Sequence, residues 1–209
     1  MTDNEQNITL GVLNAVHEDE HVTQRRIASD VGIALGLANA YLKRCAKKGL
    51  IKVQQIPANR YAYYLTPQGF AEKSRLTRDY LSQGFQFFRI ARSQCRHIFM
   101  NCQQRGQTRL VLHGLTDLAE IAVLCAADFD IELVAIIDPA TQLSDYSGIP
   151  VCAELEKAPD FDGLVITDLG NPQMAFDQIR KRIGKDKIHA PKILRISGLA
   201  DGHQGEDMT

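Results

Sequence analysis

Apolar positions in the first fifty residues recur at helical spacing and predict three short helices. Ile8, Leu10, Leu13 and Val16 define the buried side of the first. In "TQRRIASDVG" Thr23 is a typical N-cap, and Gly32 is a typical helix end. The third helix is "LGLANAYLKRCAKKG", which we expect to stop at Gly49 with one face buried. Its predicted inward residues are Ala38, Leu42, Cys45 and Ala46.

Two short runs rich in β-branched and aromatic residues follow the third helix. "LIKVQQI" and "RYAYYL" read as strands, with "PAN" turning between them at residues 57–59. Three helices followed by a β-hairpin are the order of a winged helix, in which the second and third helices form a helix-turn-helix. The stretch "RRIASDVGIALGLANAYLKRCAKKGLIKV" resembles the winged helix-turn-helix of bacterial transcription regulators. We therefore expect a DNA-binding domain over residues 1–66.

A single long helix is predicted over residues 67–106. Thr66 is placed to cap it, Pro67 suits its first turn, and Gly106 ends the pattern. Its apolar stripe needs a partner, and a second copy of the helix fits a two-fold regulator on a palindromic site. Packing of the stripe against the chain's own two domains is the alternative. The stripe comprises Leu76, Tyr80, Phe87, Ala91, Cys95, Ile98 and Cys102.

The pattern then changes to strands and helices in alternation over residues 107–197. Alternating β and α elements with apolar strands indicate a parallel sheet covered on both faces, as in a small Rossmann-like domain. The whole chain is thus predicted to be α/β, with a polar tail over 198–209 that we expect to be disordered. The predicted strands are 109–113, 131–137, 147–152, 162–167 and 192–197, and the predicted helices are 117–128, a single turn at 153–157, and 172–184.

Charge divides the chain in the same way. Residues 23–100 carry 14 basic and 3 acidic side chains, whereas residues 101–209 carry 10 basic and 17 acidic ones. The basic part favours a polyanionic partner, double-stranded DNA. No apolar run is long enough to span a membrane, and the polar, acidic N-terminus is unlike a signal peptide, so we expect a cytoplasmic protein. The five cysteines include no Cys-x-x-Cys pair, so we expect reduced thiols and no metal site.

The third helix supplies the candidate base-reading residues. Its predicted exposed side carries Gly36, Asn39, Ala40 and Lys43. An asparagine can pair with adenine and a lysine with guanine, while small residues let the backbone approach the groove. We expect the phosphate contacts to come from Arg25, Arg26, Arg44, Lys47 and Arg60.

The stretch "VLHGLTDLAEIAVL" has the strand–turn–helix pattern of a dinucleotide-binding loop. Its glycine positions hold Gly114, Thr116 and Ala119, so the middle glycine is lost. A Cβ at Thr116 crowds a phosphate, and the threonine hydroxyl is able to cap the following helix itself. Asp138, at the end of the next strand, is placed either to bind a ribose or to serve as a turn residue. The candidate ligand residues are Gly114, Leu115, Thr116, Asp138, Thr167 and Asp168.

This half of the chain resembles a known family. "HGLTDLAEIA" and "SGIPV" resemble the N-terminal Rossmann-like domain of sialic-acid and bacillosamine-type sugar O-acyltransferases. With "LTPQGFAEKSRLTRDYL" and "VITDLGNPQ", the whole chain is similar to MarR-type regulators associated with exopolysaccharide gene clusters. The resemblance implies a nucleotide-sugar or coenzyme A ligand, and Thr116 departs from its loop pattern. A domain that only dimerises or packs remains the alternative.

Together these patterns predict a dimeric DNA-binding transcriptional regulator whose second half senses a metabolite or mediates assembly. We expect no catalytic residues, no metal and no resident cofactor, because no histidine has a nucleophile beside it or metal-ligand spacing. If the loop does hold a ligand, a nucleotide or nucleotide sugar is the class it would take. The alternative function is an enzyme or sensor for a ligand linked to a nucleotide, such as a sugar, NAD or coenzyme A.

Overall fold

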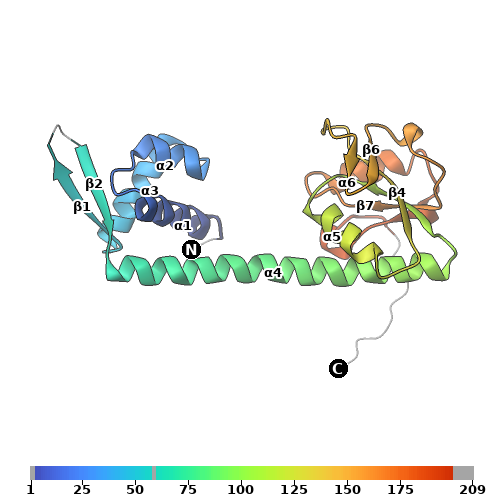
Figure 1. Cartoon of the computed structure of the whole chain (residues 1–209), viewed down its shortest axis with the longest axis horizontal. Helices are drawn as coiled ribbons and strands as arrows, with labels where there is room; N and C mark the ends of the chain where they lie inside the picture. Colours follow the sequence, from blue (N-terminus) through green and yellow to red (C-terminus); the bar gives the residue numbers. More distant parts are fainter. Residues whose placement is uncertain (1–2, 58–59, 200–209) are drawn as a thin grey trace, which may run out of the picture. The chain divides into compact units, whose positions relative to one another are not determined.

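The structure, a computed structural model, describes residues 3–57 and 60–199 and divides into two compact units (Figure 1). The N-terminal unit extends to Phe85, and the C-terminal unit begins at Gln86. The predicted turn at 57–59 lies outside the described residues at positions 58 and 59. The tail predicted over 198–209 lies outside them from residue 200 onward.

The N-terminal unit has the predicted order of three helices and a hairpin. Thr23 caps α2 by accepting a hydrogen bond from the backbone N–H of Arg26 at 3.2 Å. Gly32 ends α2 in the left-handed region, with φ of 68°. The elements of this unit are α1 (Asp3–Glu18), α2 (Gln24–Val31), α3 (Leu35–Lys47), β1 (Ile51–Ile56) and β2 (Arg60–Leu65), followed by the first part of α4 (Pro67–Gln104).

One apolar core holds this unit together. Leu13, Val16 and Ile27 are fully buried in it, and Leu42 of α3 joins them. The antiparallel wing strands pair from Ile51 opposite Leu65 to Ile56 opposite Arg60. The backbone N–H of Tyr63 also donates to the carbonyl of Glu20 at 2.8 Å, which fixes the wing to the loop after α1.

The long helix α4 begins where its cap was predicted. The hydroxyl of Thr66 accepts from the N–H of Gly69 at 3.0 Å and donates to the carbonyl of Gly49 at 2.6 Å. A Cβ at Gly69 would lie 2.0 Å from the carbonyl oxygen of Leu50, so only glycine allows α4 to start this close to β1.

The C-terminal unit is an α/β sandwich around a six-stranded sheet. The strand order is β5-β6-β4-β3-β7-β8, and all neighbours are parallel except the β5–β6 hairpin. Its strands are β3 (Arg109–His113), β4 (Glu132–Ile137), β5 (Asp145–Tyr146), β6 (Ile149–Cys152), β7 (Gly163–Ile166) and β8 (Ile188–His189). Its helices are α5 (Asp117–Ala126), α6 (Pro172–Ile179) and the short turns η1 (Leu155–Lys157), η2 (Lys185–Lys187) and η3 (Lys192–Leu194).

Two cores cover the two faces of this sheet. On one face Leu110, Leu112 and Ile136 pack against α5 and against the end of α4. On the other face Val111 and Leu164 pack against α6. Alternate residues of β3 therefore pack into the cores on opposite faces of the sheet. The almost continuous apolar sequence of the strands predicts such burial on both faces.

The predicted strand at 192–197 is wrong. The fifth parallel strand is β8, only Ile188–His189, and residues Lys192–Leu194 form η3. Pro191 has no N–H to donate to a ladder, and the N–H of Ile193 donates instead to the side chain of Gln94 on α4 at 2.9 Å. The helix predicted over 172–184 also ends earlier, at Ile179.

Most of the predicted stripe on α4 is buried inside the chain's own units. Leu76 belongs to the N-terminal core, and Ala91, Cys95 and Cys102 belong to the C-terminal core. Tyr80 is the exception, since 56% of it is exposed. The alternative of packing within the chain therefore holds for these four buried positions.

Candidate nucleic-acid interface

One face of α3 is free of packing contacts along its length. Gly36, Ala40, Lys43 and Lys47 follow one another at steps of four, three and four residues, and all are exposed. Helical periodicity places them on one side of the helix, opposite buried Ala38 and Leu42. The prediction of an exposed face is thus confirmed at Gly36, Ala40 and Lys43.

Asn39, which we placed on the same face, is only half-buried and lies at its edge. Two exposed apolar side chains at the start of α3 were not singled out from the sequence. Leu35 is 47% exposed and Leu37 is 42% exposed. In the sequence these two leucines alternate with small residues, a pattern that is common in the first turn of an amphipathic helix and does not indicate that the leucines are exposed. Apolar side chains on a helix in the major groove are suited to thymine methyl groups.

The basic side chains predicted to contact phosphate are all exposed, but they differ in their partners. Arg26 lies 3.6 Å from the carboxylate of Asp30. Arg44 is drawn back onto its own unit, 3.3 Å from the carboxylate of Glu5 and over the ring of Tyr41. Among the described residues, no carboxylate pairs with Arg25, Lys47 or Arg60. These three side chains are therefore exposed and, within the described part of the chain, have no carboxylate to compete with a polyanion.

A hollow of about 490 Å³ lies between the loop before α2 and the wing. Its lining includes His21, Gln24 and Arg60, and the Gln24 amide contacts the Tyr63 hydroxyl at 3.4 Å. No acidic side chain occupies the first turn of α2. Arg60 and the Gln24 amide lie beside the N-terminus of α2 and are donors that suit an anion such as a phosphate oxygen, while the rest of the lining is largely apolar and aromatic.

The crevice at the carboxyl ends of β3 and β7 was predicted to bind a ligand. In the structure, side chains of the crevice form hydrogen bonds with its backbone N–H and carbonyl groups. Thr116 caps α5, accepting from the N–H of Leu118 at 3.2 Å, and its hydroxyl donates to the carbonyl of Thr167 at 2.6 Å. The buried hydroxyl of Thr167 donates to the carbonyl of Gly114 at 2.6 Å. The capping role expected of Thr116 is therefore present.

Both carboxylates of the crevice bind backbone N–H groups. Asp138 accepts from Leu115 at 2.9 Å, and Asp168 accepts from Gly170 at 2.7 Å and from Asn171 at 3.1 Å. These N–H groups belong to the loops after β3 and β7, where a nucleotide fold binds phosphate. The protein's own negative charges therefore occupy donors that an anionic ligand would use.

The loops after β3 and β7 also touch directly. Gly114 has a φ of 99°, and a Cβ there would lie 2.7 Å from the backbone of Asp168. The neighbouring His113 has no hydrogen-bond partner at Nδ1 among the described residues. Burial lowers the pKa of His113, and the nearby carboxylates of Asp168 and Asp138 oppose that shift. Burial therefore favours the neutral imidazole beside these two carboxylates.

Burial disfavours the reactive thiolate form at several of the cysteines. Burial raises the pKa of Cys45 to about 11, of Cys95 to about 12 and of Cys102 to about 11, which disfavours the thiolate. Within residues 3–57 and 60–199, no three metal-ligating side chains gather as a cation site would require. Over the same residues, no helix is both long and apolar enough to cross a membrane.

Comparisons with known proteins agree with the N-terminal architecture. Residues 6–52 match the family model described as winged helix-turn-helix DNA-binding. No curated protein sequence matches the chain at a significant level.

Several solved structures resemble part of the chain. The PcaV transcriptional regulator from Streptomyces coelicolor is 21% identical over 47% of this chain and 74% of its own, with a TM-score of 0.39. MepR, a transcription regulator of the Staphylococcus aureus multidrug efflux pump MepA, is 28% identical over 39% of this chain and 62% of its own, with a TM-score of 0.33. A MepR variant bound to an oligodeoxyribonucleotide is 26% identical over 40% and 62%, also with a TM-score of 0.33.

The likenesses to the two MepR structures span less than two thirds of their chains, so the assignment rests on the family match and on the geometry of the N-terminal unit. That unit has the three helices and the hairpin, with one face of α3 exposed. Residues 6–52 therefore belong to a winged helix-turn-helix DNA-binding domain.

Proposed function

We propose that the chain is a transcriptional regulator that inserts α3 into the major groove of DNA. The observation that carries the proposal is the exposed face of α3, where Lys43 and Lys47 follow the small residues Gly36 and Ala40. In this role Lys43 and Asn39 contact base edges, because their side chains suit guanine and adenine. Arg25 and Arg60 contact phosphates, together with Arg26, Arg44 and Lys47.

The test is selection of preferred duplexes from random-sequence DNA with the full chain, followed by footprinting. Replacing both Asn39 and Lys43 by alanine should relax the preference, since each good base contact is worth about 1–3 kcal/mol. The matched control is Lys52→Ala, which removes an exposed lysine from β1. A double variant with the parent's footprint and preference would show that another face reads the DNA.

Self-association through α4 is the second part of the proposal. Tyr80, Leu81 and Phe85 are at least half exposed, and Phe88 and Ile90 are also exposed. So many apolar side chains in one helical segment are typical of an interface. A second copy of the chain is the expected partner, because a two-fold regulator matches a palindromic operator. We define residues 80–90 as the central segment of α4.

For the C-terminal unit we propose a role in assembly, with metabolite sensing as the second candidate. Assembly is supported by the N–H groups of the crevice, because they already donate to Asp138 and Asp168 and are not free for a ligand. Sensing is favoured by the order of the sheet, because β3 and β7 lie side by side at the point where the chain reverses direction across it, where such folds bind ligands. Calorimetry of the full chain with NAD, UDP-sugars and coenzyme A separates the two. Tight binding of any of them would establish a sensor or revive the enzyme alternative.

The regulated genes are proposed from the family resemblance alone. The similarity of residues 65–81 and 165–173 to exopolysaccharide-associated regulators supports control of polysaccharide or cell-envelope genes. A regulator of this kind acts in the cytoplasm. Sequencing of the DNA bound by the chain in its own cells tests this, and binding sites away from such genes would contradict it.

A further inference from the structure

The acidic C-terminal half contains one strongly basic stretch. Residues 101–179 hold 3 basic and 13 acidic side chains, whereas residues 180–195 hold 7 basic and 1 acidic. Five of the seven fall between Arg180 and Lys187, in the turn after α6 and in η2. The negative balance of this half therefore conceals a local concentration of positive charge.

Ion pairs within the unit account for only part of that charge. Arg180 pairs with Asp177 at 3.3 Å, and Arg182 pairs with Glu156 at 2.6 Å. Lys181, Lys185 and Lys187 are exposed, and over the described part of the chain no carboxylate pairs with them. These three lysines, which we call the basic surface, keep their full charge for an external partner.

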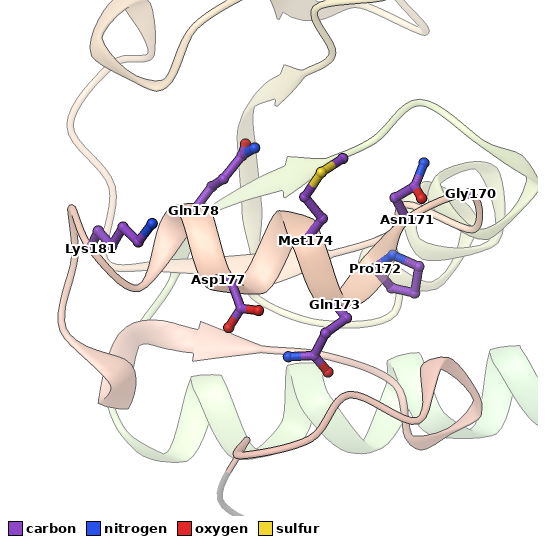
Figure 2. Close-up of a pocket in the computed structure, with 8 residues that line it drawn as sticks. All are labelled: Gly170, Asn171, Pro172, Gln173, Met174, Asp177, Gln178 and Lys181. Atoms are coloured by element: carbon purple, nitrogen blue, oxygen red, sulfur yellow. The ribbon is translucent and has the colours of Figure 1, made fainter.

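One lysine of the basic surface, Lys181, also lines a shallow hollow along the outer side of α6. This hollow has a volume of about 610 Å³ and ends at Lys181 (Figure 2). Figure 2 shows Gln178 on the last turn of α6, Lys181 in the turn that follows the helix, and Asn171 just before its first residue. The only carboxylate in the lining is Asp177, which Arg180 neutralises. Amides and ammonium groups on an exposed surface are the donors that commonly contact phosphate and sugar of a nucleic acid.

We infer that the basic surface contacts the phosphate backbone of the DNA that the winged helix holds. The inference rests on the proposed function, because the winged helix keeps DNA near the rest of the chain at a high effective concentration. The acidic side chains that prevail over residues 101–179 repel a polyanion, so the basic surface suits one better than that stretch does. Lysines that contact only phosphates increase the affinity for DNA without adding sequence preference.

The experiment compares the full-length parent with Lys181→Gln/Lys185→Gln/Lys187→Gln. Affinity for a duplex several helical turns long, carrying the selected site at its centre, is measured across a salt series. Each phosphate contact contributes about 0.9 to the slope of log affinity against log salt, so the triple variant should lose about 2 to 3 from that slope. Footprint position and sequence preference should stay unchanged.

Two controls make the result specific. Lys157→Gln removes another exposed lysine, which pairs with Glu154 at 3.5 Å, and the salt slope of this variant should match the parent more closely than that of Lys185→Gln. Lys185→Arg retains the charge and should behave as the parent. Circular dichroism and thermal unfolding verify that each variant is folded.

The outcomes separate this inference from the proposed function. A parent that binds DNA with the same salt slope as the folded triple variant overturns the inference and leaves the winged helix as the only DNA contact. The inference and the proposed function are both supported if the Asn39→Ala/Lys43→Ala variant loses sequence preference and the triple lysine variant loses only part of its salt slope. A full chain that binds no DNA at low salt overturns both.

Discussion

At the scale of single residues, a few polar side chains decide whether the loops after β3 and β7 can bind a phosphate. From the sequence, Thr116 is the expected steric obstacle to a phosphate. The structure adds the carboxylates of Asp138 and Asp168, which bind the loop N–H groups, and the contact of Gly114 with the backbone of Asp168. The bond from Leu115 to Asp138 joins segments 23 residues apart, so the sequence pattern could not predict it, whereas Asp168 binds N–H groups only two and three residues further along the chain.

Thr116→Gly alone should therefore not restore nucleotide binding. The substitution removes the capping hydroxyl, which costs a few tenths of a kcal/mol, but the two carboxylates stay in place. Calorimetry with NAD and UDP-sugars should give no binding heat for either protein, and Thr116→Ser should retain the parent's stability. A variant with micromolar affinity would show that the threonine was the whole obstacle.

His189 should make stability depend on pH. Burial, assisted by the positive charge of Arg105, lowers the pKa of His189 from 6.5 to about 4. The unfolded chain then binds a proton that the folded one excludes, so stability is full above pH 6.5 and declines as the pH falls from 6.5 towards 4. The loss is at most about 1.4 kcal/mol for each pH unit in this window.

Denaturant titrations of the parent and of His189→Gln across this pH range measure the effect. The variant should show a flatter profile, since glutamine does not titrate while it can still face Gln107, which contacts His189 at 3.0 Å. Parallel profiles for the two proteins would assign the acid sensitivity to another group.

At the scale of elements, the sequence predicted most of the helices and strands, because capping residues and apolar periodicity act locally. Thr23, Gly32 and Thr66 hold the helix boundaries that were assigned to them. The strand at 192–197 failed because an apolar run does not reveal whether its backbone will pair with a sheet or with a side chain such as that of Gln94. Local periodicity also could not show which domain core would bury each apolar residue of the α4 stripe, because these contacts form between distant parts of the chain.

The central segment of α4 carries the prediction for assembly. Leu81→Asp with Phe85→Asp should convert dimers into monomers that remain folded, because both side chains are at least half exposed. Light scattering measures the mass, and circular dichroism verifies the fold. The matched control is Ser82→Asp with Gln86→Asp, which adds the same charge at exposed polar positions of the same helix. An unchanged dimer in the apolar variant would place the interface elsewhere.

At the scale of the whole molecule, the two units have separate apolar cores. Leu13 and Ile27 lie in the core of the first unit, and Phe99 and Leu112 lie in a core of the second. The sequence predicted a domain over 1–66, a linking helix over 67–106 and a second domain over 107–197, but only the structure shows that the end of α4 forms part of the second core. Cores that share no residues can unfold separately.

Unfolding by denaturant should therefore occur in two transitions. Leu112→Ala should lower the free energy of unfolding of one transition by about 2–5 kcal/mol and leave the other in place. Leu13→Ala should affect only the remaining transition. Far-ultraviolet circular dichroism follows both, and a single transition that shifts with either substitution would show that the units unfold as one.

The carboxylates of Asp138 and Asp168 have a consequence for how much of the protein a cell contains. A domain whose loops need a bound metabolite gains stability in proportion to the logarithm of that metabolite's concentration, so its folded fraction follows nutrition. Loops whose amides are satisfied by the chain's own side chains have no such dependence. If the C-terminal unit serves in assembly, as proposed, the number of folded copies does not follow the nucleotide pool, and the protein can occupy its DNA at a level that this pool does not change.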